Sequence, residues 1–326
     1  MESPSANTTT PSKIRTVLGD IEPSSLGLTL GHDHLMTHPP DDVTDTDLVM
    51  DDLEAAIREL ELFKHAGGGA IVEMTTVDYG RDAGELEHIS RASGVHVIAA
   101  TGFNKGAFAD RLTQHYLPEE ISGWMIAEVT QGIRQFRALQ PRRENVPHVR
   151  AGVIKASSSL NGANESELVV LKAAAQAQRI TNAPISTHTE KGTWALGQIE
   201  VFMDFEVNLS KVLIGHLDLK PELPYLLEVA KTGVNLGFDQ FGKLKYLPDP
   251  ERVNLIVQLC EAGFSSQIIL GGDMARKSYF KSYGGGPGLE HVPTTIQNML
   301  TQAGLSSEII TKLFIDNPRR WLEFEG

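Results

Sequence analysis

Short, nearly continuous apolar runs recur along the chain, and polar residues follow the end of each run. Runs of this length suit parallel strands that are buried on both faces of a sheet. The pattern therefore predicts strands over residues 26–30, 68–76, 95–102, 150–155, 184–188, 211–216, 233–239 and 267–273.

Helical patterns lie between these runs. Residues 51–65 open with acidic side chains and end before glycines, and residues 165–180 are rich in Ala, Leu and Gln. Residues 221–231, 250–262 and 293–303 each begin with a proline, which suits a first helical turn. Strands that alternate with helices over one undivided chain predict an α/β fold, a (β/α)8 TIM barrel. A doubly wound open sheet is the competing architecture, but no Gly-x-Gly-x-x-Gly motif follows the first strand.

Composition limits the possible partners. The 326 residues carry a net charge of −13 without basic runs, which argues against nucleic acid or an anionic membrane as a partner. No apolar run approaches the ~20 residues that span a bilayer. The single cysteine, Cys260, excludes disulfide frameworks within the chain and favours a cytoplasmic location. Residues 1–12 are polar and rich in Ser, Thr and Pro, which predicts a disordered tail before a single domain over residues 13–326.

Histidines, a lysine and an aspartate stand at the ends of the predicted strands. His32 and His34 are two residues apart, which places both imidazoles on the same face of a strand. The later candidates follow at intervals of about one or two βα units of ~30 residues. Because the carboxyl ends of barrel strands meet at one mouth, we expect a single site there. Its members are His32, His34, Lys155, His188, His216 and Asp273.

This set of side chains exceeds what one tetrahedral zinc ion requires, and it fits two divalent ions ~3.5–4 Å apart. Lys155 is the unusual member, because an ammonium group has no lone pair and repels cations. Carboxylation by carbon dioxide would turn Lys155 into an anionic ligand that can bridge both ions. Imidazoles and carboxylates accept Zn, Mn, Co or Fe, and Zn is the first expectation.

The sequence resembles the phosphotriesterase family of the amidohydrolase superfamily from about residue 16 to 322. Five motifs carry the resemblance: Gly31-His32-Asp33-His34, Val153-Ile154-Lys155, Ser186-Thr187-His188-Thr189, Ile214-Gly215-His216-Leu217-Asp218 and Gly272-Asp273. The resemblance implies that His32, His34 and Asp273 bind the more buried metal. It implies that His188 and His216 bind the more exposed one, while carboxylated Lys155 and a hydroxide bridge the two. Asp33 replaces the usual glutamate, and its side chain should point away from the metals.

A site of this kind hydrolyses esters at carbon or phosphorus. The bridging hydroxide attacks, one metal polarises the substrate oxygen, and Asp273 accepts a proton and passes it to the leaving group. The expected catalytic residues are therefore Asp273 and Lys155. The metal ligands do not distinguish a lactone from a carboxyl ester or a phosphotriester. The choice of substrate therefore depends on the loops at the mouth of the barrel.

Basic and aromatic residues follow the seventh and eighth predicted strands. Arginine can hold a phosphate through two hydrogen bonds, and lysine adds a point charge. These loops resemble the branch of the family that opens phosphorylated sugar lactones. The resemblance implies that Lys245, Arg276 and Tyr279 bind the substrate phosphate, with Lys243 as a substitute for Lys245.

The leading hypothesis is a binuclear metal-dependent lactonase for a small phosphorylated furanose lactone, an anionic small-molecule substrate. The alternative is an N-acyl-homoserine lactonase or a phosphotriesterase, although such lactonases usually carry an arginine where Gln240 stands. A non-catalytic binding protein of the same fold ranks last, because every ligand position is filled. The resemblance also implies a homodimer.

Overall fold

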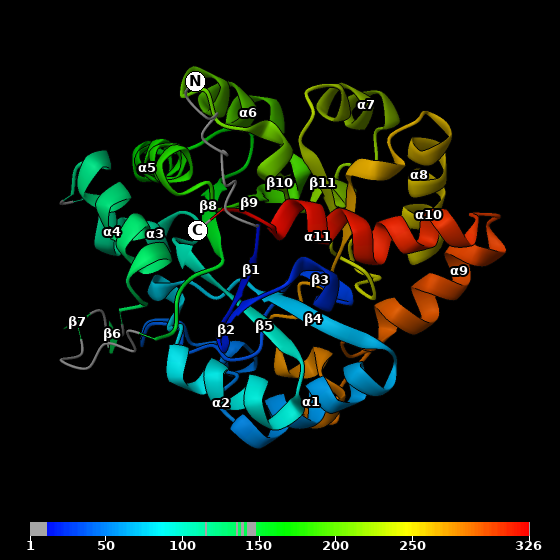
Figure 1. The fold of residues 1–326 in the computed structure, drawn as a ribbon, viewed down its shortest axis with the longest axis horizontal. Coiled ribbons are helices and arrows are strands. Elements are labelled where there is room, and N and C mark those ends of the chain that lie inside the picture. Colours follow the sequence, from blue (N-terminus) through cyan, green and yellow to red (C-terminus); the bar gives the residue numbers. More distant parts are fainter. Residues whose placement is uncertain (1–11, 115, 135, 138–139, 142–147, 326) are drawn as a thin grey trace, which may run out of the picture.

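A computed structural model describes residues 12–325 except 115, 135, 138–139 and 142–147 (Figure 1). Eight parallel strands form one sheet in the order β12-β11-β10-β9-β8-β5-β4-β3. The strands are β3 (Leu28–Asp33), β4 (Gly68–Glu73), β5 (His96–Gly102), β8 (Val153–Ser158), β9 (Ile185–Thr189), β10 (Val212–Ile214), β11 (Asn235–Phe238) and β12 (Ile268–Leu270). The two end strands of this order, β12 and β3, come together where the N–H of Asp273, just after β12, donates to the carbonyl of His32 in β3 at 2.9 Å. The sheet is thus a nearly closed barrel, and the predicted (β/α)8 fold is confirmed while the open sheet is wrong.

Helices lie between the strands and surround the barrel (Figure 1). They are α1 (Leu53–His65), α2 (Ala83–Ser93), α3 (Ala107–Thr113), α4 (Pro118–Thr130), α5 (Glu165–Thr181), α6 (Ala195–Asp204), α7 (Leu223–Lys231), α8 (Asp249–Glu261), α9 (Gln297–Gln302), α10 (Ser307–Thr311) and α11 (Asn317–Leu322). Four of the five predicted helices correspond to α1, α5, α7 and α8. The fifth begins as a π-helical turn, Val292–Ile296, and continues as α9.

The amino end of the barrel is covered by the two ends of the described chain. The hairpin of β1 (Ile14–Thr16) and β2 (Gly19–Ile21) lies there with α11. The Trp321 indole N–H lies 3.2 Å from the carbonyl oxygens of Ile185 and Lys211, at the starts of two barrel strands. A short hairpin of β6 (Phe136–Arg137) and β7 (Gln140–Pro141) lies outside the barrel. The predicted tail lies outside the described residues except for Ser12.

Successive side chains along each strand point alternately into the barrel and outward toward the helices, which gives two hydrophobic layers. Val72, Ile98, Val153, Leu213 and Ile269 belong to one cluster, contributed by five strands, which fills the barrel interior. The neighbouring residues on the same strands pack outward against the helices. A Cβ atom on Gly31 of β3 would overlap the side chain of Ile269, so glycine is required where this strand faces the interior.

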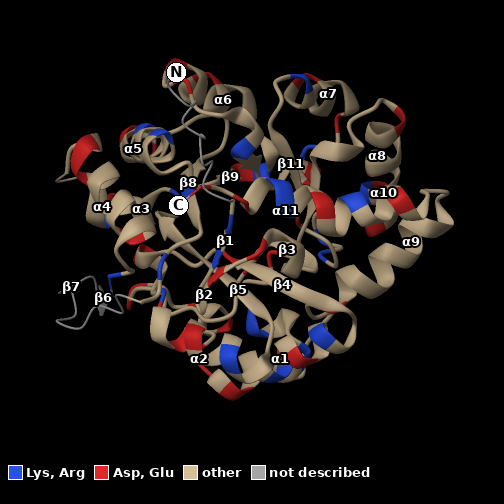
Figure 2. Ribbon diagram, viewed as in Figure 1, with Lys and Arg blue, Asp and Glu red and all other residues tan. Residues whose placement is uncertain are grey.

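Charged residues are distributed over the outside of the barrel. Acidic and basic positions are interspersed along the outer helices (Figure 2). Within the described part of the chain, no helix is both long and apolar enough to cross a membrane.

Candidate active site

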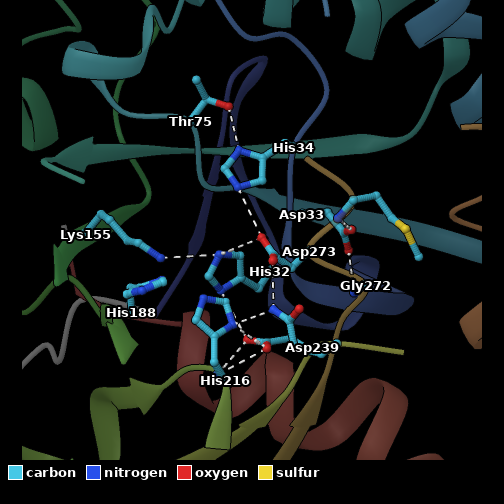
Figure 3. Close-up of polar contacts among 12 residues, drawn as sticks. His32, Asp33, His34, Thr75, Lys155, His188, His216, Asp239, Gly272 and Asp273 are labelled. Atoms are coloured by element: carbon cyan, nitrogen blue, oxygen red, sulfur yellow. Dashed lines mark hydrogen bonds and ion pairs between the residues drawn. The ribbon is translucent and has the colours of Figure 1, made fainter. Parts of the chain in front are cut away.

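The six candidate side chains meet at the carboxyl end of the barrel (Figure 3). They come from β3 and the residue after it (His32, His34), from β8 (Lys155), from β9 (His188) and from the segments after β10 and β12 (His216, Asp273). The ring centroid of His216 lies 4.8 Å from that of His32 and 4.5 Å from that of His188. The Nζ atom of Lys155 lies 3.3 Å from Nε2 of His32. The structure therefore brings six residues from five segments of the sequence into one cluster.

His34 is held with its Nε2 atom toward this cluster. Its Nδ1 atom lies 2.8 Å from the Thr75 hydroxyl, and that hydroxyl donates to Glu73 at 2.5 Å. Because the hydroxyl gives its one proton to Glu73, it accepts from His34, so the neutral imidazole carries its proton on Nδ1. The Nε2 lone pair is then directed toward Asp273, whose Oδ1 atom lies 3.4 Å away.

Asp239, the residue after β11, holds two of the imidazoles. Its Oδ1 atom lies 2.7 Å from Nδ1 of His216, and its Oδ2 atom lies 3.2 Å from Nδ1 of His32. One buried carboxylate therefore occupies the Nδ1 edge of both rings, and such partners orient imidazoles that bind metals. The sequence pattern marks Asp239 only as a strand end, and that position at the barrel mouth is the signal that could have found it.

Asp239 is itself fixed by a buried ion pair beneath its loop. Asp218 accepts hydrogen bonds from the backbone N–H groups of Asp239 and Gln240, at 3.4 and 3.2 Å. The Arg252 Nε atom donates to Asp218 at 2.7 Å, and both side chains are fully buried. Arg252 also bonds to the Leu247 carbonyl, so one guanidinium ties α8 to the loop that carries the orienting carboxylate.

Lys155 stands two positions after Val153 on β8, so its side chain also points into the barrel interior. Its side chain is only 3% exposed. Burial lowers the pKa of Lys155 to about 8, although Asp273 and Asp239 act in the opposite direction. Burial and then the Lys155 charge lower the pKa of His32 to about 3, so this imidazole is neutral. A lysine with a depressed pKa offers the neutral amine that carbon dioxide requires.

The two oxygens of Asp273 have different surroundings. Oδ1 faces His34 and His32, whereas Oδ2 accepts from Lys243 and from the Gln240 amide, both at 2.7 Å. Burial acts to raise the pKa of Asp273, but Lys243 and the histidines outweigh it and hold that pKa well below its ordinary value. Lys243, predicted as a possible phosphate ligand, is thus buried against the carboxylate of the cluster.

His188 lies on the more open side of the cluster. Its side chain is 18% exposed, against 3% for His32. Its Nε2 atom lies 3.2 Å from Oε2 of Glu190, and the same oxygen is ion-paired with Lys105 on the loop after β5. Neither Glu190 nor Lys105 belongs to the set predicted from the sequence.

Asp33 points away from the cluster, toward Gly272 (Figure 3). Its carboxylate accepts hydrogen bonds from the backbone N–H groups of Gly272 and Met274, at 3.0 and 2.9 Å. Burial raises the pKa of Asp33 to about 8. Asp33 therefore joins β3 to the segment after β12 and helps to close the barrel.

The predicted phosphate-binding residues lie on the loops after β11 and β12. The Nζ atoms of Lys243 and Lys245 lie 5.3 and 5.6 Å from the ring centroid of Tyr279, so the two lysines share one aromatic ring. Arg276 is ion-paired through Nη1 with Asp45 and Asp47 at 2.7 and 3.3 Å. Lys245 and Tyr279 are thus adjacent, whereas Arg276 is held at the side of the mouth by the loop after β3.

The donor set fits a metal centre. Ligand atoms of His32, His34 and Asp273 lie within 4.8 Å of one another, as do those of His32, His216 and Asp239. In the second group, the carboxylate of Asp239 faces the Nδ1 atoms of His32 and His216, so it orients these rings and leaves their Nε2 atoms for a metal. The first group coincides with the ligands predicted for the more buried metal.

A (β/α)8 barrel with imidazoles, a buried lysine and an aspartate at its mouth has the architecture of a metal-dependent hydrolase. The model of the phosphotriesterase family matches residues 12–322, and the chain belongs to this family. It is a hydrolytic enzyme that acts on ester bonds.

Three proteins show the extent of the similarity. A phospho-furanose lactonase from Mycoplasmopsis synoviae is 33% identical, with 95% of this chain and 92% of that protein covered. The structure of a lactonase from Listeria monocytogenes superposes with a TM-score of 0.89 at 32% identity, covering 97% of this chain and 100% of that chain. The structure of the phosphotriesterase homology protein from Escherichia coli, with phosphate in its active site, has a TM-score of 0.85 at 29% identity over 91% of this chain and 99% of that chain.

Proposed function

We propose that the protein is a binuclear metal-dependent lactonase that opens a small phosphorylated furanose lactone. The observation that carries the proposal is the placement of Lys245 and Tyr279 together on the two loops beside Asp273. A cationic and hydroxyl-bearing pair at the mouth of a chain with net charge −13 suits an anionic substrate. A relative named for phospho-furanose lactones, and a related structure with phosphate in its active site, support this choice.

The metal ligands in this proposal are those that the family resemblance implies. His32, His34 and Asp273 would hold one divalent ion, and His188 and His216 the other, with carboxylated Lys155 between them. Zn is the first expectation. Such a pair of ions supplies a water of lowered pKa and polarises the substrate carbonyl.

The chain's own residues would then orient the substrate and move the proton. Lys243 and Gln240 hold Oδ2 of Asp273, so that Oδ1 faces the reacting groups. Asp273 takes a proton from the attacking water and returns it to the ring oxygen of the lactone as the ring opens. Lys245 and Tyr279 bind the phosphate. Arg276 contributes as well, through its remaining guanidinium N–H groups, because its Nη1 atom is ion-paired with Asp45 and Asp47.

Hydrolysis assays test this proposal directly. The enzyme, reconstituted with Zn and bicarbonate, is assayed on phosphorylated ribono-γ-lactone, plain ribono-γ-lactone, an N-acyl-homoserine lactone and a neutral aryl phosphotriester. We expect the highest kcat/KM on the phosphorylated lactone, and competitive inhibition by sugar phosphates. Preference for the acyl-homoserine lactone or the phosphotriester would reject the proposed substrate in favour of the alternative.

A further inference from the structure

Lys105 lies across the barrel mouth from the proposed phosphate-binding loops. It follows β5, and β5 stands four strands from β11 in either direction around the eight-stranded order. In a closed barrel of eight strands, positions four apart face each other across the mouth. A substrate whose phosphate lies against Lys245 and Tyr279 therefore extends its other end toward Lys105.

The loop that carries Lys105 is fixed on both sides of this residue. The Phe103 N–H donates to the Lys155 carbonyl at 3.3 Å, which ties the loop to the metal-binding strand β8. The Asn104 N–H donates to buried Asp78 at 2.9 Å, and the Gly106 N–H donates to buried Glu167 at 2.8 Å. Two buried carboxylates therefore hold the backbone that presents the Lys105 side chain.

The loop that carries Lys105 can pass this close to β8 only because Gly102 precedes it. Gly102 has a φ of +98°, and a Cβ atom at this position would overlap the Lys155 carbonyl oxygen. The sequence Gly102-Phe103-Asn104-Lys105 thus brings a cation beside the strand that carries Lys155.

The Lys105 side chain reaches the open side of the cluster. Its ammonium group is ion-paired with Glu190, whose Oε2 atom lies 3.2 Å from Nε2 of His188. The side chains of Lys105 and Glu190 are 34% and 30% exposed, so a ligand in the mouth can reach both. The carboxylate of Glu190 thus occupies a position between a lysine and a candidate metal ligand.

We propose that Lys105 binds the carboxylate that forms when the lactone opens, and that Glu190 is its counter-ion before the ligand arrives. This inference rests on the proposed function. Water adds to the acyl carbon, the bond from that carbon to the ring oxygen breaks, and the ring oxygen leaves as a hydroxyl with a proton from the water. The new carboxyl group releases its second proton and remains as a carboxylate at the end of the molecule remote from the phosphate.

Product binding tests this inference with two variants that change affinity in opposite directions. Binding of opened phosphoribonate to the Zn-loaded enzyme is measured by calorimetry for the wild type, Lys105→Met, Glu190→Gln and the control Lys172→Met. Lys172 is an exposed residue of α5. We expect Kd to rise by about 10- to 100-fold in Lys105→Met, the range of one charge-assisted hydrogen bond. Kd should fall in Glu190→Gln, because the competing carboxylate is lost, and stay unchanged in Lys172→Met.

If the Lys105–Glu190 pair serves only to brace two loops, both variants will weaken product binding, and the inference is overturned. An unchanged Kd in Lys105→Met overturns it as well. Metal content and thermal unfolding are measured for each variant, and Lys105→Arg, which keeps the charge, should restore most of the affinity.

A comparison of two opened products separates this inference from the proposed function. Plain and phosphorylated ribono-γ-lactone give the same new carboxylate, so Lys105→Met should raise Kd for both ribonate and phosphoribonate. A loss of affinity confined to the phosphorylated product would make Lys105 a phosphate ligand and overturn the inference. A wild-type enzyme that opens neither lactone would instead reject the proposed function.

Discussion

The two sides of the candidate metal centre differ in how their imidazoles are held. On the side of His32 and His34, the Nδ1 atoms lie against Asp239 and Thr75, and the rings are almost fully buried. On the other side, His216 is equally buried and is held by the same Asp239, whereas His188 is more exposed and its Nε2 atom faces Glu190. The first side is therefore arranged for metal binding before any ion arrives. On the second side, His188 is not held in this way and must turn from Glu190 to bind a metal.

The largest effect is expected at Lys155, the proposed bridge between the two sides. Lys155→Ala removes the group that carries the proposed bridging carboxylate, so kcat/KM should fall about a thousandfold, equivalent to ~4 kcal/mol. Kinetic assays and metal analysis of the purified variant measure this loss. Added formate or acetate should restore part of the activity by supplying a carboxylate. Full activity and full metal content in the variant would show that Lys155 bridges nothing.

The next largest effect concerns the substrate. Arg276→Ala and Lys245→Ala would each remove a proposed charge-assisted phosphate contact of ~1.5–3 kcal/mol, so kcat/KM on the phosphorylated lactone should fall roughly 10- to 200-fold. The plain lactone serves as the control, because it never makes these contacts and its hydrolysis should change little. Equal losses on both substrates would refute the phosphate contact.

The fixed imidazoles of His32 and His216 are tested through Asp239, the carboxylate that orients them. Asp239→Asn keeps the shape of the side chain but removes the carboxylate charge that faces the Nδ1 atoms of two imidazoles, so metal affinity should fall about 10- to 100-fold. Calorimetric titration of the metal-free protein with Zn measures the change. Asn182→Asp, at the exposed C-cap of α5, is a matched change of amide and carboxylate that should leave metal affinity unaltered. Wild-type affinity in Asp239→Asn would contradict the orienting role.

The smallest effect is expected at an exposed pair on the rim. Glu85, at 2.9 Å, raises the pKa of His38 above its ordinary value. A raised histidine pKa stabilises the fold below the unfolded-state pKa of ~6.5, and this contribution is lost as pH rises through the folded-state value. Because His38 is 39% exposed, His38→Gln should cost less than ~1 kcal/mol at pH 6 and nothing at pH 9. Urea denaturation at both pH values checks this, and an equal cost at the two would contradict it.

Most of the barrel could be predicted from sequence because its strands are buried on both faces and therefore read as apolar runs. Helix α2 was not predicted, because Gly84, His88 and Ser90 give its sequence a weak helical signal. Its ends are instead marked by Asp82, which caps the first turn, and by Gly94 in the left-handed region. Such capping signals are short, so tertiary packing rather than propensity decides whether the helix forms.

The candidate site was predictable only in part. Histidines at strand ends are visible as a pattern of spacing, but Asp239 gains its role from the direction of its carboxylate, which spacing does not encode. Lys243 and Lys245 are two residues apart in sequence, yet the structure places one against Asp273 and the other over Tyr246 and Tyr279. Glu190 and Lys105 meet only because β5 and β9 both end at the mouth.

The central claim is that these residues hold two metal ions, one on each side of Lys155. It is tested most directly by counting ions in wild-type protein reconstituted with Zn and bicarbonate, and by locating them through anomalous diffraction. The account predicts about two ions per chain, one at His32, His34 and Asp273 and one at His188 and His216, with extra density on Lys155 Nζ between them. A single ion per chain, or ions located away from these ligands, would contradict it.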